Sequence, residues 1–169
     1  MIFGDKEKLA IECIFDEKSK TDEQILFGRI AILAGGFRLG DISLTVILNI
    51  PMLFFQQSLK DCEKRRSDFF NQMNAEAVWE LLYSALYDNY ESDINESYEL
   101  DKKYRKFCIC PGFSEAFDGE IAFLIEDEQE ERFIWMDAQT EQIKEVRLRP
   151  ETYKNVVESL LSGIQTNYS

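Results

Sequence analysis

With 169 residues the chain has the length of a single domain, and we expect one domain over residues 1–169. Its formal net charge is −13 and it contains no histidine, so the commonest general base and the commonest metal ligand are both missing. The excess of acid opposes binding to nucleic acid and favours a basic partner. We see no secretory signal and no run apolar enough for a bilayer, so we expect a cytoplasmic protein that does not bind membranes.

The first third of the chain predicts an antiparallel meander. Residues 9–15 alternate in a way typical of a strand. A second run, residues 25–33, is rich in apolar and β-branched side chains. Gly35 and Gly36 then suit a tight turn into a third strand at residues 37–39.

Helices are expected in the middle of the chain. Pro51 can open a first helix, because proline is tolerated in a first helical turn. Asn74 can cap a second helix that carries an apolar stripe. Residues 88–101 follow as a long loop or a frayed helix, and residues 106–110 as a short strand.

The last third predicts a second meander and a final helix. Its strands are expected at residues 121–126, 132–136 and 143–148, separated by junctions short enough for hairpins. Pro150 opens the helix and Gly163 is placed to end it. The fold class is therefore α+β, with antiparallel sheets from the N-terminal meander and the C-terminal three-strand meander packed against central helices and a C-terminal helix.

The four cysteines are Cys13, Cys62, Cys108 and Cys110, and no pair has the CxxC spacing of a metal or redox motif. Cys108 and Cys110 would share one face of a strand. We interpret this pair as two small buried hydrophobic residues in a reducing compartment, and a redox or metal role is the alternative.

Two acidic segments are the best candidates for function. Asp88–Asp101 holds six acidic residues and no basic one, interleaved with tyrosines, and Glu126–Glu131 holds five acidic residues at an expected hairpin tip. Tyrosines can anchor an interface while carboxylates steer a basic partner. The candidate contact residues are Tyr90, Glu91, Asp93, Glu96 and Tyr98 in the first segment and Glu128, Glu130 and Glu131 in the second.

Several short motifs are spread over the chain. They are Met1–Asp5 (MIFGD), Ala10–Glu12 (AIE), Phe27–Arg29 (FGR) with Ile32 and Gly36, Leu39–Asp41 (LGD), Phe117–Gly119 (FDG), and the closing strand and helix around residues 148–160. In these motifs the chain resembles the immunity protein 42 family of bacterial polymorphic toxin systems. The specific motifs lie in the first 41 residues.

The resemblance implies a cytoplasmic antitoxin, encoded beside its toxin, that binds the C-terminal domain of the toxin without catalysis, metal or cofactor. The acidic surface indicates that this partner is basic, and we predict a nuclease. Because toxin-facing surfaces must differ between cognate pairs, we expect the motif glycines and aspartates to shape turns instead of contacts. These residues are Gly4, Asp5, Gly28, Gly36, Gly40 and Asp41.

Two other functions compete with this one. A small carboxylate-dependent, metal-binding hydrolase or transferase would need three or more acids converging in a concave pocket. A scaffold protein whose acidic residues serve solubility alone would need no defined site.

Overall fold

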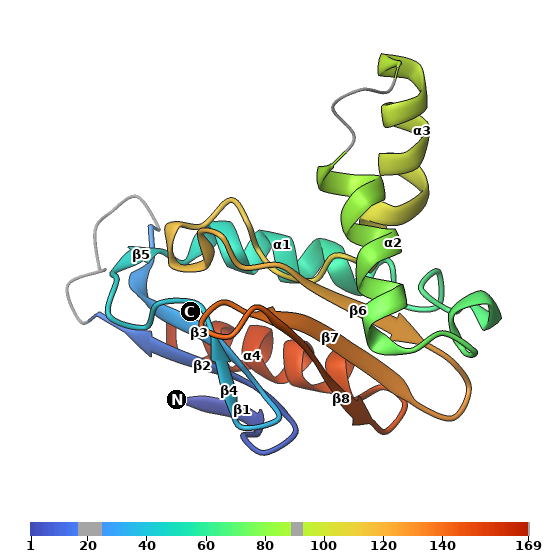
Figure 1. Ribbon diagram of the computed structural model, residues 1–169. Helices are drawn as coiled ribbons and strands as arrows, with labels where there is room; N and C mark the ends of the chain where they lie inside the picture. Colours follow the sequence, from blue (N-terminus) through green and yellow to red (C-terminus); the bar gives the residue numbers. More distant parts are fainter. Residues whose placement is uncertain (17–24, 89–92, 169) are drawn as a thin grey trace.

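Two antiparallel sheets and four α-helices make up the residues that the computed structural model describes, 1–16, 25–88 and 93–168 (Figure 1). The strands are β1 (Ile2–Asp5), β2 (Leu9–Phe15), β3 (Phe27–Ala34), β4 (Phe37–Leu39), β5 (Val46–Ile47), β6 (Ala122–Glu126), β7 (Glu131–Asp137) and β8 (Gln142–Leu148). The helices are α1 (Asn49–Leu59), α2 (Ala75–Tyr87), α3 (Ile94–Tyr104) and α4 (Thr152–Tyr168), with short 3₁₀ turns η2 (Asp68–Phe70), η3 (Arg105–Phe107) and η4 (Glu115–Phe117). The α+β class and both predicted meanders are confirmed.

The N-terminal sheet has the order β1-β2-β3-β4, and β5 pairs with the first residues of β3. The pattern did not predict β1 or β5, because each is too short to show an alternation. In the register between β2 and β3, Ile11 faces Ile32 and Cys13 faces Ile30, and all four side chains are buried. Helix α4 packs against β1, β2 and α1, so it covers this sheet.

The motif glycines and aspartates shape the backbone, although at Gly28, within β3, the reason is close packing and not the predicted turn. Gly4 adopts a φ of 111°, which side-chain-bearing residues rarely reach. A Cβ atom on Gly28 would lie 2.2 Å from the carbonyl oxygen of Ile14, so only glycine allows this close approach of β3 to β2. Asp5 and Asp41 each accept a hydrogen bond from the backbone N–H two residues further on.

The C-terminal sheet, of order β6-β7-β8, separates two apolar cores. Leu124 and Phe133 belong to the core shared with the N-terminal sheet, α1 and α4. Phe123 and Ile134, from alternate positions of the same strands, belong to the core beneath α2, η2 and η3. Because both faces of β6 are covered, its whole length is buried, which explains its continuous apolar sequence.

Helix α4 continues past Gly163, so the prediction that this glycine ends the helix is wrong. Its reason is packing: a Cβ atom on Gly163 would lie 2.6 Å from the ring of Phe3. The glycine therefore lets β1 approach α4 closely. Tyr153, Val157 and Leu160 bury the other apolar positions of the helix in the first core.

The middle of the chain differs from its prediction at one point. Asn74 caps α2 as expected, since its Oδ1 accepts the N–H of Ala77 at 2.9 Å. Residues 106–110 do not form the predicted strand: η3 is followed by a single antiparallel bridge between Cys108 and Phe123. Cys108 and Cys110 are nevertheless both buried, as interpreted, and all four cysteines are free thiols.

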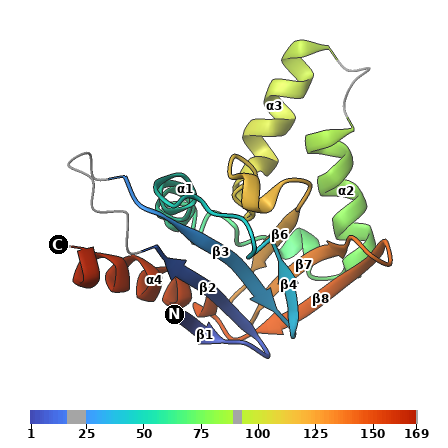
Figure 2. The same ribbon diagram turned by 90° about the vertical axis from the view of Figure 1, so that its left-hand side faces the viewer.

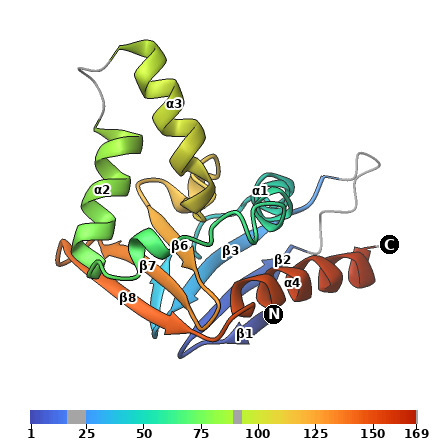
Figure 3. The same ribbon diagram turned by 90° about the vertical axis from the view of Figure 1, so that its right-hand side faces the viewer.

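Helix α3 projects away from the two sheets in all three views (Figures 1, 2 and 3), whereas α2 packs on the C-terminal sheet, where the ring of Trp79 lies 5.2 Å from that of Phe123. No side chain of α3 is buried, and the helix packs mainly against α2 and η3. No helix within the described part of the chain has the length and apolar character needed to span a lipid bilayer.

Candidate functional site

The first group of predicted contact residues lies at the outer end of α3. Asp93 caps this helix through a hydrogen bond from its first turn, and Glu96 follows, exposed. Tyr98 is 64% exposed one turn into the helix. Tyr90 and Glu91 lie outside the described residues. The three described residues therefore form an exposed, acidic and aromatic surface.

The second group lies at the turn between β6 and β7. Asp127 organises this turn, because its Oδ1 accepts the N–H groups of Gln129 at 2.6 Å and Glu130 at 2.8 Å. Glu128 is exposed and Glu130 is paired with Arg147 of β8. The turn and the outer end of α3 lie at separate places on the molecule (Figures 1 and 3).

Glu131 does not lie at the exposed tip, so its predicted position there is wrong. It is only 3% exposed, because it opens β7 on the same face as Phe133 and Trp135, which point into the first core. One of its carboxylate oxygens accepts the backbone N–H of Tyr153 at 2.9 Å.

Behind the turn lies a buried polar cluster that the sequence pattern did not reveal. Arg65 is fully buried, and its Nε donates to Oε1 of Glu126 at 2.7 Å. Its Nη1 donates to the carbonyl of Ser58 at 3.0 Å, and its guanidinium lies 5.3 Å from the ring centroid of Tyr153. The hydroxyls of Ser58 and Tyr153 are 2.7 Å apart. Because Arg65 and Glu126 are distant in sequence, only tertiary structure brings them together.

The same cluster perturbs Glu131. Burial raises the pKa of its carboxyl to about 7, and the nearby Glu126 carboxylate adds to this effect. The N–H of Tyr153 and the guanidinium of Arg65 act in the opposite direction but do not offset it. Glu131 therefore changes its charge near neutral pH.

A pocket of about 250 Å³ opens onto this cluster. It is lined by Leu59, Cys62, Glu63, Arg66, Glu126, Asp127, Glu131, Pro150, Glu151 and Lys154. Five of these residues are acidic, but Glu126, Asp127 and Glu131 already accept hydrogen bonds from protein groups. Within the described residues, no group of three or more His, Cys, Asp or Glu side chains is arranged to hold a metal ion.

A family model described as immunity protein 42 matches residues 1–163. The crystal structure of CdiI from Burkholderia dolosa AUO158 superimposes with a TM-score of 0.70 at 15% sequence identity, covering 96% of this chain and 99% of that chain. At that identity the likeness shows a shared fold alone. Among curated proteins, no sequence matches significantly.

Proposed function

The chain belongs to the immunity protein 42 family, and from this membership we propose that it is an antitoxin that binds and neutralises a cognate contact-dependent or polymorphic toxin. The observation that carries the proposal is the extent of the family match, which covers residues 1–163 and so nearly the whole chain. The shared fold with a protein named CdiI agrees with it.

Inhibition would be stoichiometric and non-enzymatic, and it would occur in the cytoplasm. Such an inhibitor needs a surface complementary to the toxin and no reactive group. The net charge of −13 supports a basic toxin domain, and a nuclease with a cationic cleft is the class we propose. Opposite charges can raise association rates towards ~10⁸–10⁹ M⁻¹s⁻¹ at low salt.

The exposed positions of both acidic segments support a role in toxin contact. On α3 these are Asp93, Glu96 and Tyr98, and in the β6–β7 turn the exposed residue is Glu128, while Glu130 beside Arg147 is half-buried. Tyr90 and Glu91 remain proposed contacts on the sequence pattern alone. Glu131 is proposed to support the turn from within, because its carboxylate is buried.

Titration calorimetry tests this proposal. The full chain would be titrated against the C-terminal toxin domain encoded beside it, at low and at high salt, with a toxin domain from an unrelated system as the control. We expect tight one-to-one binding to the cognate domain only, weakening as salt screens the charges. Failure to bind the cognate domain at either salt concentration would overturn the antitoxin proposal.

A further inference from the structure

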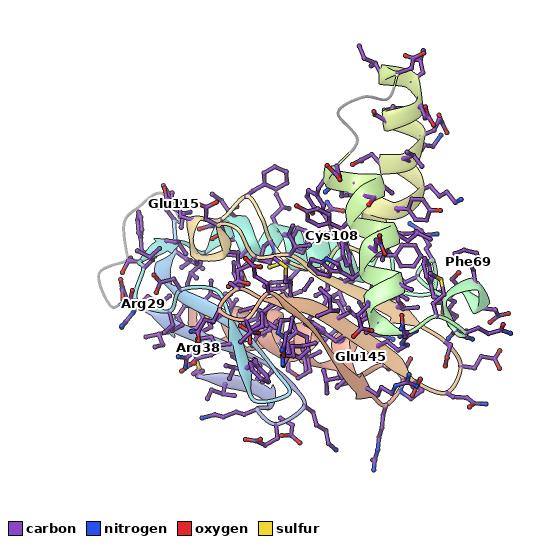
Figure 4. All side chains as sticks on the ribbon, in the orientation of Figure 1. Arg29, Arg38, Phe69, Cys108, Glu115 and Glu145 are labelled. Atoms are coloured by element: carbon purple, nitrogen blue, oxygen red, sulfur yellow. The ribbon has the colours of Figure 1, made fainter. Side chains whose placement is uncertain are left out.

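Phe69 is an exposed aromatic residue that is held in place by packed neighbouring rings. It lies in η2, its side chain is 64% exposed, and it points away from the body of the molecule (Figure 4). Its ring packs edge-on against Phe70 at 5.2 Å between centroids, and Phe70 packs in the same way against buried Phe107 at 5.2 Å. Such a ring loses little freedom when a partner covers it.

An acidic hollow of about 620 Å³ lies beside η2, between this turn and the β6–β7 turn. Its lining residues are Arg66, Ser67, Asp68, Asn71, Asp127, Glu128, Gln129 and Glu130. The lining therefore contains four carboxylates and one guanidinium. Asp68 and Glu128 are exposed, and neither belongs to an ion pair within the described residues.

Both walls of the hollow are held by internal hydrogen bonds. The N–H of Ser67 donates to the carbonyl of Glu126 at 3.3 Å, which ties the segment before η2 to the end of β6. Beneath η2, Nη1 of buried Arg132 donates to the carbonyl of Phe70 at 2.8 Å. Arg132 is itself paired with Glu145 of β8. The hollow is thus preformed.

We infer that the toxin domain docks on this Phe69 surface, defined as the acidic hollow together with Phe69, which follows Asp68 in η2 and lines a separate hollow with Lys103 and Lys106 on its other side. This inference rests on the proposed antitoxin function and assigns its main contact. Lysine or arginine side chains of the toxin would enter the hollow, and an apolar pocket of the toxin would receive the Phe69 ring. A buried aromatic anchor beside a charged rim is the arrangement in which a few residues dominate binding energy.

Charge favours a basic toxin domain as the partner, and rigidity favours the Phe69 surface as the place where it binds. Two copies of a chain with a net charge of −13 repel one another, so an acidic hollow does not suit a second copy. Compared with the outer end of α3, where no side chain is buried, the Phe69 surface is anchored by Phe70 and Arg132. Less conformational entropy is lost when the more rigid surface binds.

Calorimetry of the full chain against the neighbouring toxin domain tests the inference. Phe69→Ala should raise the Kd about 30-fold or more, as expected for removal of a central aromatic anchor. Phe113→Ala is the matched control, because Phe113 is 89% exposed and lies two residues before Glu115, on the opposite side of the molecule in Figure 4. The Kd of Phe113→Ala for the toxin domain should equal that of the wild type. Melting curves would verify that both variants fold.

A second pair of variants tests the hollow. Asp68→Lys with Glu128→Lys should slow association and reduce its dependence on salt. Glu96→Lys with Glu99→Lys makes the same change of charge on exposed positions of α3, and its effect should be clearly smaller.

The outcomes separate the two proposals. If the wild type and Phe69→Ala bind the toxin domain equally well, the assignment of the Phe69 surface as the docking site is wrong, but the antitoxin function is supported. The same conclusion follows if Phe113→Ala loses as much affinity, or if reversal on α3 has the larger effect. If the wild type does not bind the toxin domain, both the antitoxin proposal and the proposed docking surface are wrong.

Discussion

Glu131 is buried at the start of β7, and its carboxyl has a pKa of about 7 instead of its ordinary value of 4.5. The substitution Glu131→Gln removes this titration while keeping a side-chain oxygen that can accept the N–H of Tyr153. The variant therefore isolates the effect of one buried charge on stability.

The magnitude follows from the two pKa values. Between pH 4.5 and pH 7 the folded protein holds the Glu131 proton and the unfolded chain releases it, so rising pH favours unfolding. Each pH unit in this window removes about 1.4 kcal/mol, which amounts to about 3 kcal/mol over the window. The stabilising contribution is complete below pH 4.5 and is lost as pH rises through 7.

Urea unfolding at pH 5 and pH 8 measures this effect. Relative to the wild type, Glu131→Gln should gain about 2–3 kcal/mol in free energy of unfolding between the lower and the higher pH. Exposed Glu128 provides the matched control, since Glu128→Gln should show no such gain. If Glu131→Gln and the wild type differ in free energy of unfolding by the same amount at both pH values, Glu131 does not carry a raised pKa in the folded protein.

Two further predictions concern packing and buried charge. Arg65→Met should lower the free energy of unfolding by about 3–5 kcal/mol, because it leaves Glu126 buried without its cation. Adding Glu126→Gln should recover part of that loss in urea unfolding, and a double variant no more stable than the single one would contradict the pairing. Gly163→Ala would stabilise an exposed helix by about 0.5–1 kcal/mol, but here we expect a loss of about 1–3 kcal/mol, since the added Cβ meets the ring of Phe3. The loss should shrink in a Phe3→Leu background, and a higher melting temperature for Gly163→Ala alone would contradict the contact.

The secondary structure was predictable where the pattern is local. The alternation of residues 9–15 and the cap at Asn74 each correspond to an element found there. The short strand β1 was not predictable, because its four residues form a strand only through pairing with β2. The role of Gly163 is not predictable from its neighbours, because it depends on Phe3 at the other end of the chain.

The candidate site also has parts that the sequence predicts and parts that it does not. Clusters of acidic residues are visible in the sequence, and so is the turn that carries Glu128. The burial of Glu131 has a local signal in the sequence, because in a strand this residue shares a face with Phe133 and Trp135, both apolar. Phe69 had no such signal, since its exposure depends on how the neighbouring Phe70 packs against Phe107.

Local patterns in the chain are enough to predict the α+β class, the two meanders, the acidic character and the family, because periodicity, composition and short motifs are properties of neighbouring residues. Three features became visible only in the folded molecule: Arg65 meets Glu126, α3 projects, and an aromatic ring stands beside an acidic hollow. Contacts between distant segments depend on the packing of whole sheets and helices, and no local pattern records that packing.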